Sequence, residues 1–180
     1  LAQLDQLRDG FSEAMEQEME AMWASKLGLA RYDAELVNGL VELMVLSKVD
    51  YTIFFRQLSE IPEDLAALQA SFYLPSPEPL AERWSPWLQR WRDHIASHGD
   101  ASATSRAMKR VNPQITWREW LVAPAYQQAG QGDNGLIQEL QQVFRHPYDD
   151  LPAELEAKYN RPKPREFFNA GGVSHYSCSS

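Results

Sequence analysis

Cysteine is scarce in this sequence, and long apolar runs are absent. The 180 residues include one cysteine, Cys178, third from the end. A single thiol cannot form an internal disulfide, so we expect a fold suited to a reducing, cytoplasmic setting. The longest apolar candidate, residues 40–46, is interrupted by Glu42 and falls far short of the roughly 20 residues of a membrane span. Because the chain starts at Leu1 without a signal-peptide pattern, we expect it to derive from a longer or processed protein.

Positive charge is scarce as well. Lys and Arg number 17 against 25 Asp and Glu, which gives a formal net charge of −8 and a pI of about 5.0. Nucleic acids and anionic lipid surfaces are bound by clustered Lys and Arg, and the most basic stretch, residues 106–110, is short. We therefore expect neither a nucleic-acid partner nor a membrane partner.

Phosphate-binding signatures are missing too. The sequence contains no G-x-x-x-x-G-K-[ST], the glycine-rich loop whose backbone amides cradle phosphates. The spacing G-x-G-x-x-G occurs once, at residues 130–135, but between two predicted helices rather than after a strand, which is the setting that a dinucleotide-binding loop requires. The strand lysine and the metal-binding Asp and Asn of kinase-type transfer are not recognisable. The sequence thus predicts no catalytic, cofactor-binding or metal-binding residue in this chain.

What the sequence does contain is helical periodicity. Apolar residues recur at steps of three and four, without the sustained alternation typical of strands. The pattern predicts an all-α, multi-helix bundle-like domain, in which Asp33 and Asp50 cap helices and Gly28 ends one. In the first helix we expect an apolar, methionine-rich stripe in the core and an acidic side in solvent. The stripe is Leu4, Leu7, Phe11, Met15, Met19 and Met22, and the acidic side is Glu13, Glu16, Glu18 and Glu20.

Tryptophans mark the second half of the domain. Trp84, Trp87 and Trp91 share one face of a predicted helix. Large indoles that lie close together are typical of helix–helix packing. We expect this face to be buried against the segment that carries Trp117 and Trp120.

Prolines set the remaining boundaries. The next helix is predicted to begin at Asn112-Pro113 or at Thr116, and Pro124 should kink or split it. Periodicity disappears from Pro147 onward. The sequence therefore divides into a helical domain, residues 1–146, and an extended tail containing Pro, Gly and Ser, residues 147–180.

Two short clusters could carry chemistry. His94 and His98 have a spacing that can hold a metal ion, but no third ligand completes the set, so we interpret them as surface residues. Ser174, His175 and Cys178 combine nucleophile and base types, but a flexible terminus lacks the fixed oxyanion site that a cysteine nucleophile requires. A redox role for Cys178 stays open, since an accessible tail thiol can reach a partner. An inert terminal thiol is the alternative.

Four segments carry further information. They are residues 22–29 (MWASKLGL), 50–59 (DYTIFFRQLS), 108–149 and the terminal Cys178-Ser179-Ser180. As an ordered set they resemble the C-terminal region of the selenoprotein O family. Family members usually read Asn-Pro-x-x-x-Leu-Arg-Asn in the third segment. Here Trp117 replaces the leucine, Arg118 is kept and Glu119 replaces the asparagine.

The resemblance implies a parent protein with a kinase-like (pseudokinase) fold that transfers AMP from ATP, with Mg or Mn, to Ser, Thr or Tyr hydroxyls of proteins. It places the residues that bind the nucleotide and the metal upstream of this chain, so no such residue is assigned here. The fragment alone would need no cofactor. The resemblance assigns one functional residue to this chain, Cys178, as a redox-responsive cysteine. The implied partners are the missing N-terminal kinase-like domain and the protein substrates of the parent.

Two interpretations follow. In the first, the chain is the helical C-terminal region of a protein adenylyltransferase, supports its kinase-like core and carries a redox-responsive tail cysteine. In the second, it is a stand-alone helical protein-interaction module without catalytic activity. They differ in whether the source gene continues upstream with kinase-like motifs.

Overall fold

The computed structural model describes residues 2–74 and 78–168, and this part of the chain is helical. The α-helices are α1 (Ala2–Leu27), α2 (Ala34–Ser47), α3 (Tyr51–Leu58), α4 (Glu78–His98), α5 (Ala101–Lys109), α6 (Glu119–Gly130), α7 (Gly135–Phe144) and α8 (Ala153–Tyr159). Two 3-10 helices are η1 (Leu65–Ser71) and η2 (Arg165–Phe167). Among the described residues, β pairing is limited to one antiparallel bridge between Val49 and Phe72. The predicted all-α fold is confirmed. No helix in these ranges is long and apolar enough to cross a membrane.

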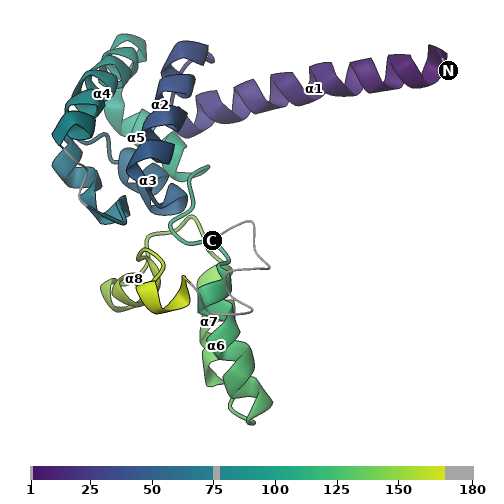
Figure 1. The fold of residues 1–180 in the computed structure, drawn as a ribbon, viewed down its shortest axis with the longest axis vertical. Coiled ribbons are helices and arrows are strands. Elements are labelled where there is room, and N and C mark those ends of the chain that lie inside the picture. The colour runs from purple at the N-terminus through teal and green to yellow at the C-terminus, as the bar shows by residue number, and fades with distance from the viewer. Residues whose placement is uncertain (1, 75–77, 169–180) are drawn as a thin grey trace.

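The helices form two units, each with its own apolar core (Figure 1). The upper unit contains α2, α3, α4, α5 and the C-terminal end of α1. The lower unit is the α6–α7 hairpin with α8 beside it. The N-terminal part of α1 projects away from both units.

Local capping signals set the boundaries of the upper unit. Asp33 accepts a hydrogen bond from the Leu36 amide at 2.9 Å, and Asp50 accepts one from the Ile53 amide at 3.1 Å, so both predicted N-caps are confirmed. α1 ends before Gly28, whose φ of +66° is a conformation that glycine adopts without strain. A Cβ there would lie 2.6 Å from the Thr104 methyl group on α5. Glycine therefore ends α1 and also lets α5 approach it closely.

Three tryptophans of α4 form the centre of the upper core, as predicted. Trp84, Trp87 and Trp91 are buried. Each indole N–H donates at 2.8 Å, to Ser47 Oγ, to the Leu36 carbonyl and to the Leu27 carbonyl respectively. These acceptors belong to α2 and to the end of α1, and they fix the side of α4 that faces the core.

The predicted partner of this tryptophan face was wrong. Trp120 packs in the lower core, and Trp117 is 57% exposed. Periodicity identifies the apolar face of a helix, but the pairing of faces depends on where the chain turns between them. Here the 110–118 segment leads away from α4 before Trp117 is reached.

The boundaries predicted for the next helix also need correction. α6 begins at Glu119, not at Asn112 or Thr116, and it continues through Pro124 as one helix. Residues 112–118 are instead engaged by distant parts of the chain, as described below for the junction between the units. Contacts far apart in sequence have overridden the local capping pattern.

The structure differs from two further expectations, the burial of the α1 stripe and the extended form of the tail. Phe11, Met15 and Met19 are exposed, because the N-terminal turns of α1 lie beyond the body of the upper unit. The described part of the expected extended tail contains α8 and η2. The additional helix is explained by Leu151, Leu155 and Tyr159, which recur every four residues and join the lower core.

Trp91 offers a test of the upper core. Replacing it with Ala removes a fully buried indole and leaves a cavity, so we expect a loss of about 3–5 kcal/mol in the free energy of unfolding. Trp117→Ala is the matched control: its side chain is largely exposed, and we expect a loss of about 1 kcal/mol or less. Urea unfolding followed by circular dichroism measures both, and equal losses would contradict the assignment of the core.

Candidate functional site

Where the two units meet, charged and amide side chains are buried together. They come from the end of α1, from the start and end of α3, and from the 110–118 segment. Buried members are Lys26, Asp50, Arg56, Ser59, Asn112, Gln114 and Arg118. Burying such groups is costly unless each finds a partner, so their contacts determine what the junction does.

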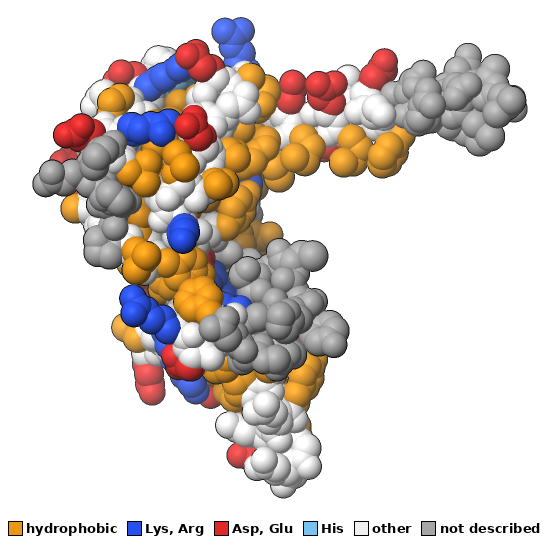
Figure 2. Space-filling view, in the orientation of Figure 1, with side chains coloured by type: hydrophobic (Ala, Val, Ile, Leu, Met, Phe, Trp, Pro, Cys, Tyr) orange, Lys and Arg blue, Asp and Glu red, His pale blue; other side chains and the backbone are white. Residues whose placement is uncertain are grey.

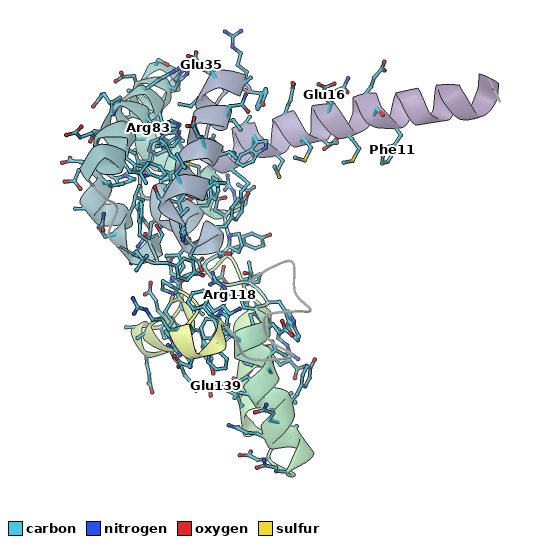
Figure 3. All side chains as sticks on the ribbon, viewed as in Figure 1. Phe11, Glu16, Glu35, Arg83, Arg118 and Glu139 are labelled. Carbon is cyan, nitrogen blue, oxygen red and sulfur yellow. The ribbon has the colours of Figure 1, made fainter. Side chains whose placement is uncertain are left out.

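Asp50 and Arg118 form the central pair. Both guanidinium nitrogens of Arg118 donate to the Asp50 carboxylate, Nη2 at 2.6 Å to Oδ1 and Nη1 to Oδ2. The side chains are 4% and 7% exposed. The same carboxylate caps α3 and accepts a hydrogen bond from the Tyr73 hydroxyl at 3.2 Å. Because Arg118 directly precedes α6, one carboxylate joins the start of α3 to the start of α6. Figure 3 labels Arg118 at the place where the two units meet.

Arg56 binds the backbone of two loops. Its Nη1 donates to the carbonyls of Lys109 at 3.2 Å, Asn112 at 3.1 Å and Tyr148 at 3.0 Å. Its Nη2 donates to Asp150 at 2.5 Å, and this bond lowers the pKa of the Asp150 carboxyl. Arg56 thus connects α3 to the end of α5 and to the loop that follows α7.

Lys26 and Asn112 complete the junction. The Lys26 ammonium donates to Asn112 Oδ1 at 2.8 Å and lies over the rings of Tyr51 and Phe55, 5.0 and 4.5 Å from their centroids. The Asn112 amide donates in return to the Lys26 carbonyl at 2.8 Å and to Ser59 Oγ at 3.0 Å. Burial lowers the pKa of Lys26 to about 8. The end of α1 is therefore attached to the same segment that Arg56 holds.

The 112–118 segment is not helical because its hydrogen bonds go elsewhere. The amides of Gln114 and Ile115 donate to the Pro147 carbonyl, at 2.7 and 3.4 Å. Gln114 Oε1 accepts from the Leu151 amide at 2.7 Å, and the hydroxyls of Thr52 and Thr116 share a hydrogen bond of 3.2 Å. A helix starting at Asn112 would have to give up these contacts.

Two of the hollows close to the junction differ in their linings. One, of about 540 Å³, includes Asp50, Thr52, Tyr73, Arg118 and Lys163 in its lining. In it, the charges of Asp50 and Arg118 neutralise each other. The other, of about 470 Å³, lies between α6 and α7 and is mainly apolar. The hydrogen bonds and ion pairs of the junction fix the two units relative to each other.

His94 and the four glutamates of α1 that were singled out in the sequence lie outside this junction. His94 Nε2 is 3.3 Å from Asp33 Oδ2, which also accepts from Arg90. The Leu36 amide, followed by Arg90 and His94, lowers the pKa of Asp33. The side chain of His98 lies outside the described part of the structure, as do Ser174, His175 and Cys178. Glu13, Glu16, Glu18 and Glu20 are exposed on α1. The described residues bring no three His, Cys, Asp or Glu side chains together as a metal site.

The junction was not predicted from the sequence, although a signal for part of it was present. Arg56 follows Ile53, Phe54 and Phe55 in a helix that is apolar on most of its surface. A charged residue in such a setting has to be paired when it is buried. The pattern predicts that a partner exists, but it cannot identify one that lies 92 or 94 residues away.

Comparison with known proteins places the chain in a family. Residues 1–145 match the family described as "Protein adenylyltransferase SelO". A protein nucleotidyltransferase YdiU of Azoarcus sp. (strain BH72) is 34% identical over 178 residues, and the YdiU protein of Tolumonas auensis is 35% identical over 181 residues. Each match covers 94% of this chain and 34% of the relative. The chain belongs to the SelO family, and it spans about a third of the length of these relatives.

Asp50→Asn tests the central pair. The substitution leaves the Arg118 guanidinium buried without a counter-charge, so we expect a loss of about 3–5 kcal/mol in the free energy of unfolding at pH 7. Glu139→Gln is the control, since the Glu139–Lys158 bridge at 2.8 Å is solvent-exposed and its loss should cost less than about 1 kcal/mol. Denaturant unfolding of both variants measures the difference, and a small loss for Asp50→Asn would show that the pair is not essential.

Proposed function

We propose that this chain is the C-terminal helical region of a longer protein adenylyltransferase, which transfers AMP from ATP to Ser, Thr or Tyr hydroxyls of other proteins. One observation carries the proposal: the family match covers residues 1–145, while the chain spans only 34% of relatives named as protein nucleotidyltransferases. In this proposal the catalytic, kinase-like part lies in the residues of the longer protein that precede this chain.

The role proposed for this region is structural support. The Asp50–Arg118 pair and the Arg56 contacts fix the angle between the upper and lower units. Two units held at a fixed angle can present a surface of defined shape to a neighbouring domain, with little ordering cost on docking. This supports a function as a buttress for the catalytic part.

We assign ATP and Mg²⁺ or Mn²⁺ to the upstream part of the longer protein rather than to the described residues of this chain. No three possible metal-ligating side chains meet within 2–74 and 78–168. The guanidinium groups of Arg56 and Arg118, which could otherwise bind phosphates, already hold carboxylates and backbone carbonyls. The proposal therefore assigns the nucleotide and the metal to the upstream part, and no step of the transfer is attributed to this chain.

A labelling experiment tests the proposed activity. The protein from the full reading frame, incubated with Mg–ATP labelled at the α-phosphate, should incorporate label into protein, whereas the 180-residue chain alone should not. ATP labelled at the γ-phosphate is the control, because AMP transfer leaves that phosphate in pyrophosphate. Calorimetry of the isolated chain with Mg–ATP should show no specific binding. A micromolar Kd, about −8 kcal/mol, would place a nucleotide site within this chain.

Cys178 provides a separate test of redox control. In the isolated chain we expect air oxidation to give only intermolecular dimers that reductant reverses, because the chain contains no second cysteine. In the full-length protein we expect oxidation to close an internal bridge through Cys178 and slow AMP transfer. Full-length wild type and Cys178→Ser should then be equally active in reductant and differ under oxidising conditions. Identical responses across a redox titration would exclude Cys178 as the switch.

A further inference from the structure

The N-terminal turns of α1 carry an apolar stripe that the described residues leave uncovered. Phe11, Met15 and Met19 are 66%, 48% and 46% exposed. Every described side chain from residue 10 to residue 21 is exposed. Figure 3 shows Phe11 and Glu16 pointing to opposite sides of the helix, as in an amphipathic helix. Glu18, which was predicted to lie on the acidic side, is spaced to fall on the side of the stripe instead.

Such a helix requires a partner. Isolated helices are only marginally stable in water, and in proteins most helical stability comes from packing of the apolar face. Neighbouring exposed apolar residues aligned on one side of an element also mark interaction sites. The stripe therefore has the character of a docking surface for an apolar partner.

We propose that the α1 stripe docks onto the part of the same polypeptide that precedes this chain in the longer protein, against an apolar surface with a basic side chain facing Glu18. The inference rests on the proposed function, since it takes the upstream part to be present. It deepens that proposal by naming the surface through which this region supports the catalytic part.

Chain length favours this occupant. The relatives from Azoarcus and Tolumonas have roughly two thirds of their length outside the match. In Figure 1 the N-terminus of the chain lies at the tip of α1, far from both units. Polypeptide continuing from that tip would be tethered beside the stripe, and tethering gives a docking segment a high effective concentration.

The position of the stripe also favours a domain-sized partner. Figure 2 shows hydrophobic side chains along the edge of α1 that faces the lower unit, and acidic side chains along the opposite edge. At the base of α1 the apolar surface continues into a hollow of about 540 Å³ whose lining includes Met22, Tyr51 and Val111. The stripe and this hollow together line the inner side of the angle between α1 and the body.

Charge argues against a second copy of this chain as the occupant. Glu18 lies three residues after Met15 and four before Met22, so it falls on the apolar face rather than with Glu16 on the opposite side. It also lines the hollow at the base of α1. Pairing two copies would bring together chains of net charge −8, each with a carboxylate at the contact. A partner with a basic group at this point would instead form a complementary contact.

Oxidation of native methionines tests the proposal. The 180-residue chain and the full-length protein would be treated with hydrogen peroxide, and the oxidation rate of each methionine followed by mass spectrometry. Sulfoxide formation follows exposure of the thioether, so we expect Met15 and Met19 to oxidise at least about tenfold more slowly in the full-length protein. Met44 and Met108 are buried within the chain and should be slow in both proteins.

Matched variants make the result specific to the stripe. Val45 on α2 is 70% exposed, and a Val45→Met variant should oxidise rapidly in both proteins. Phe11→Asp in the full-length protein should restore fast oxidation of Met15 and Met19, whereas Glu16→Ala, on the other side of α1, should not. Circular dichroism of each variant checks that the helical fold is retained.

The outcomes separate this inference from the proposed function. Equal oxidation rates of Met15 and Met19 in the two proteins would overturn the docking surface. A dimeric mass of the full-length protein in reductant, lost in Phe11→Asp, would also overturn it by identifying a second copy as the occupant. AMP transfer measured on the same full-length sample is independent: protection without transfer supports the interface and refutes the activity, and transfer without protection does the reverse.

Discussion

The contact between Asp50 and Arg118 is the constraint on which the arrangement of the two units depends. A carboxylate and a guanidinium that are both shielded from water have to stay together, because separating them would leave an uncompensated charge on each side. The carboxylate also caps the N-terminus of α3, where it accepts a hydrogen bond from the Ile53 amide. The position of α6 is thus tied to a helix terminus in the other unit rather than to a flexible loop.

Around this pair, polar and apolar forces have different roles. The apolar cores stabilise each unit separately, one around the α4 tryptophans and one around Trp120, Leu140 and Val143. Apolar packing is weakly directional and would permit several angles between the units. The hydrogen bonds of Arg56 and Asn112 have defined geometry, and they select one of these angles. A supporting region benefits from this division, because its shape is set before its partner docks.

Local physics made part of this structure predictable. A carboxylate before an apolar helix predicted the caps at Asp33 and Asp50, and the preference of glycine for positive φ predicted the end of α1 at Gly28. The path of residues 112–118 could not be read in the same way, because Pro147, Asp50 and Thr52 decide it from a distance. The methionine stripe shows a related limit: periodicity identifies an apolar face, but it does not say whether the same chain covers it. The junction was not predicted: Asp50 was expected only as a helix cap and Arg118 only as part of the family resemblance, and their pairing across 68 residues emerged from the structure. The role of Cys178 stays a prediction.

The hydrogen bonds of Arg56 to backbone carbonyls have a consequence for sequence variation. Three of its four acceptors are backbone carbonyls, at Lys109, Asn112 and Tyr148, and every residue type has such a carbonyl. Through these contacts Arg56 specifies where the two loops run without specifying the side chains at Lys109 and Tyr148. The Lys109 side chain is separately held by Glu60 at 2.5 Å, so the freedom to vary falls on the Tyr148 position, whose side chain is 46% exposed. As long as the main chain passes this guanidinium, the surface at residue 148 can change without moving the two units.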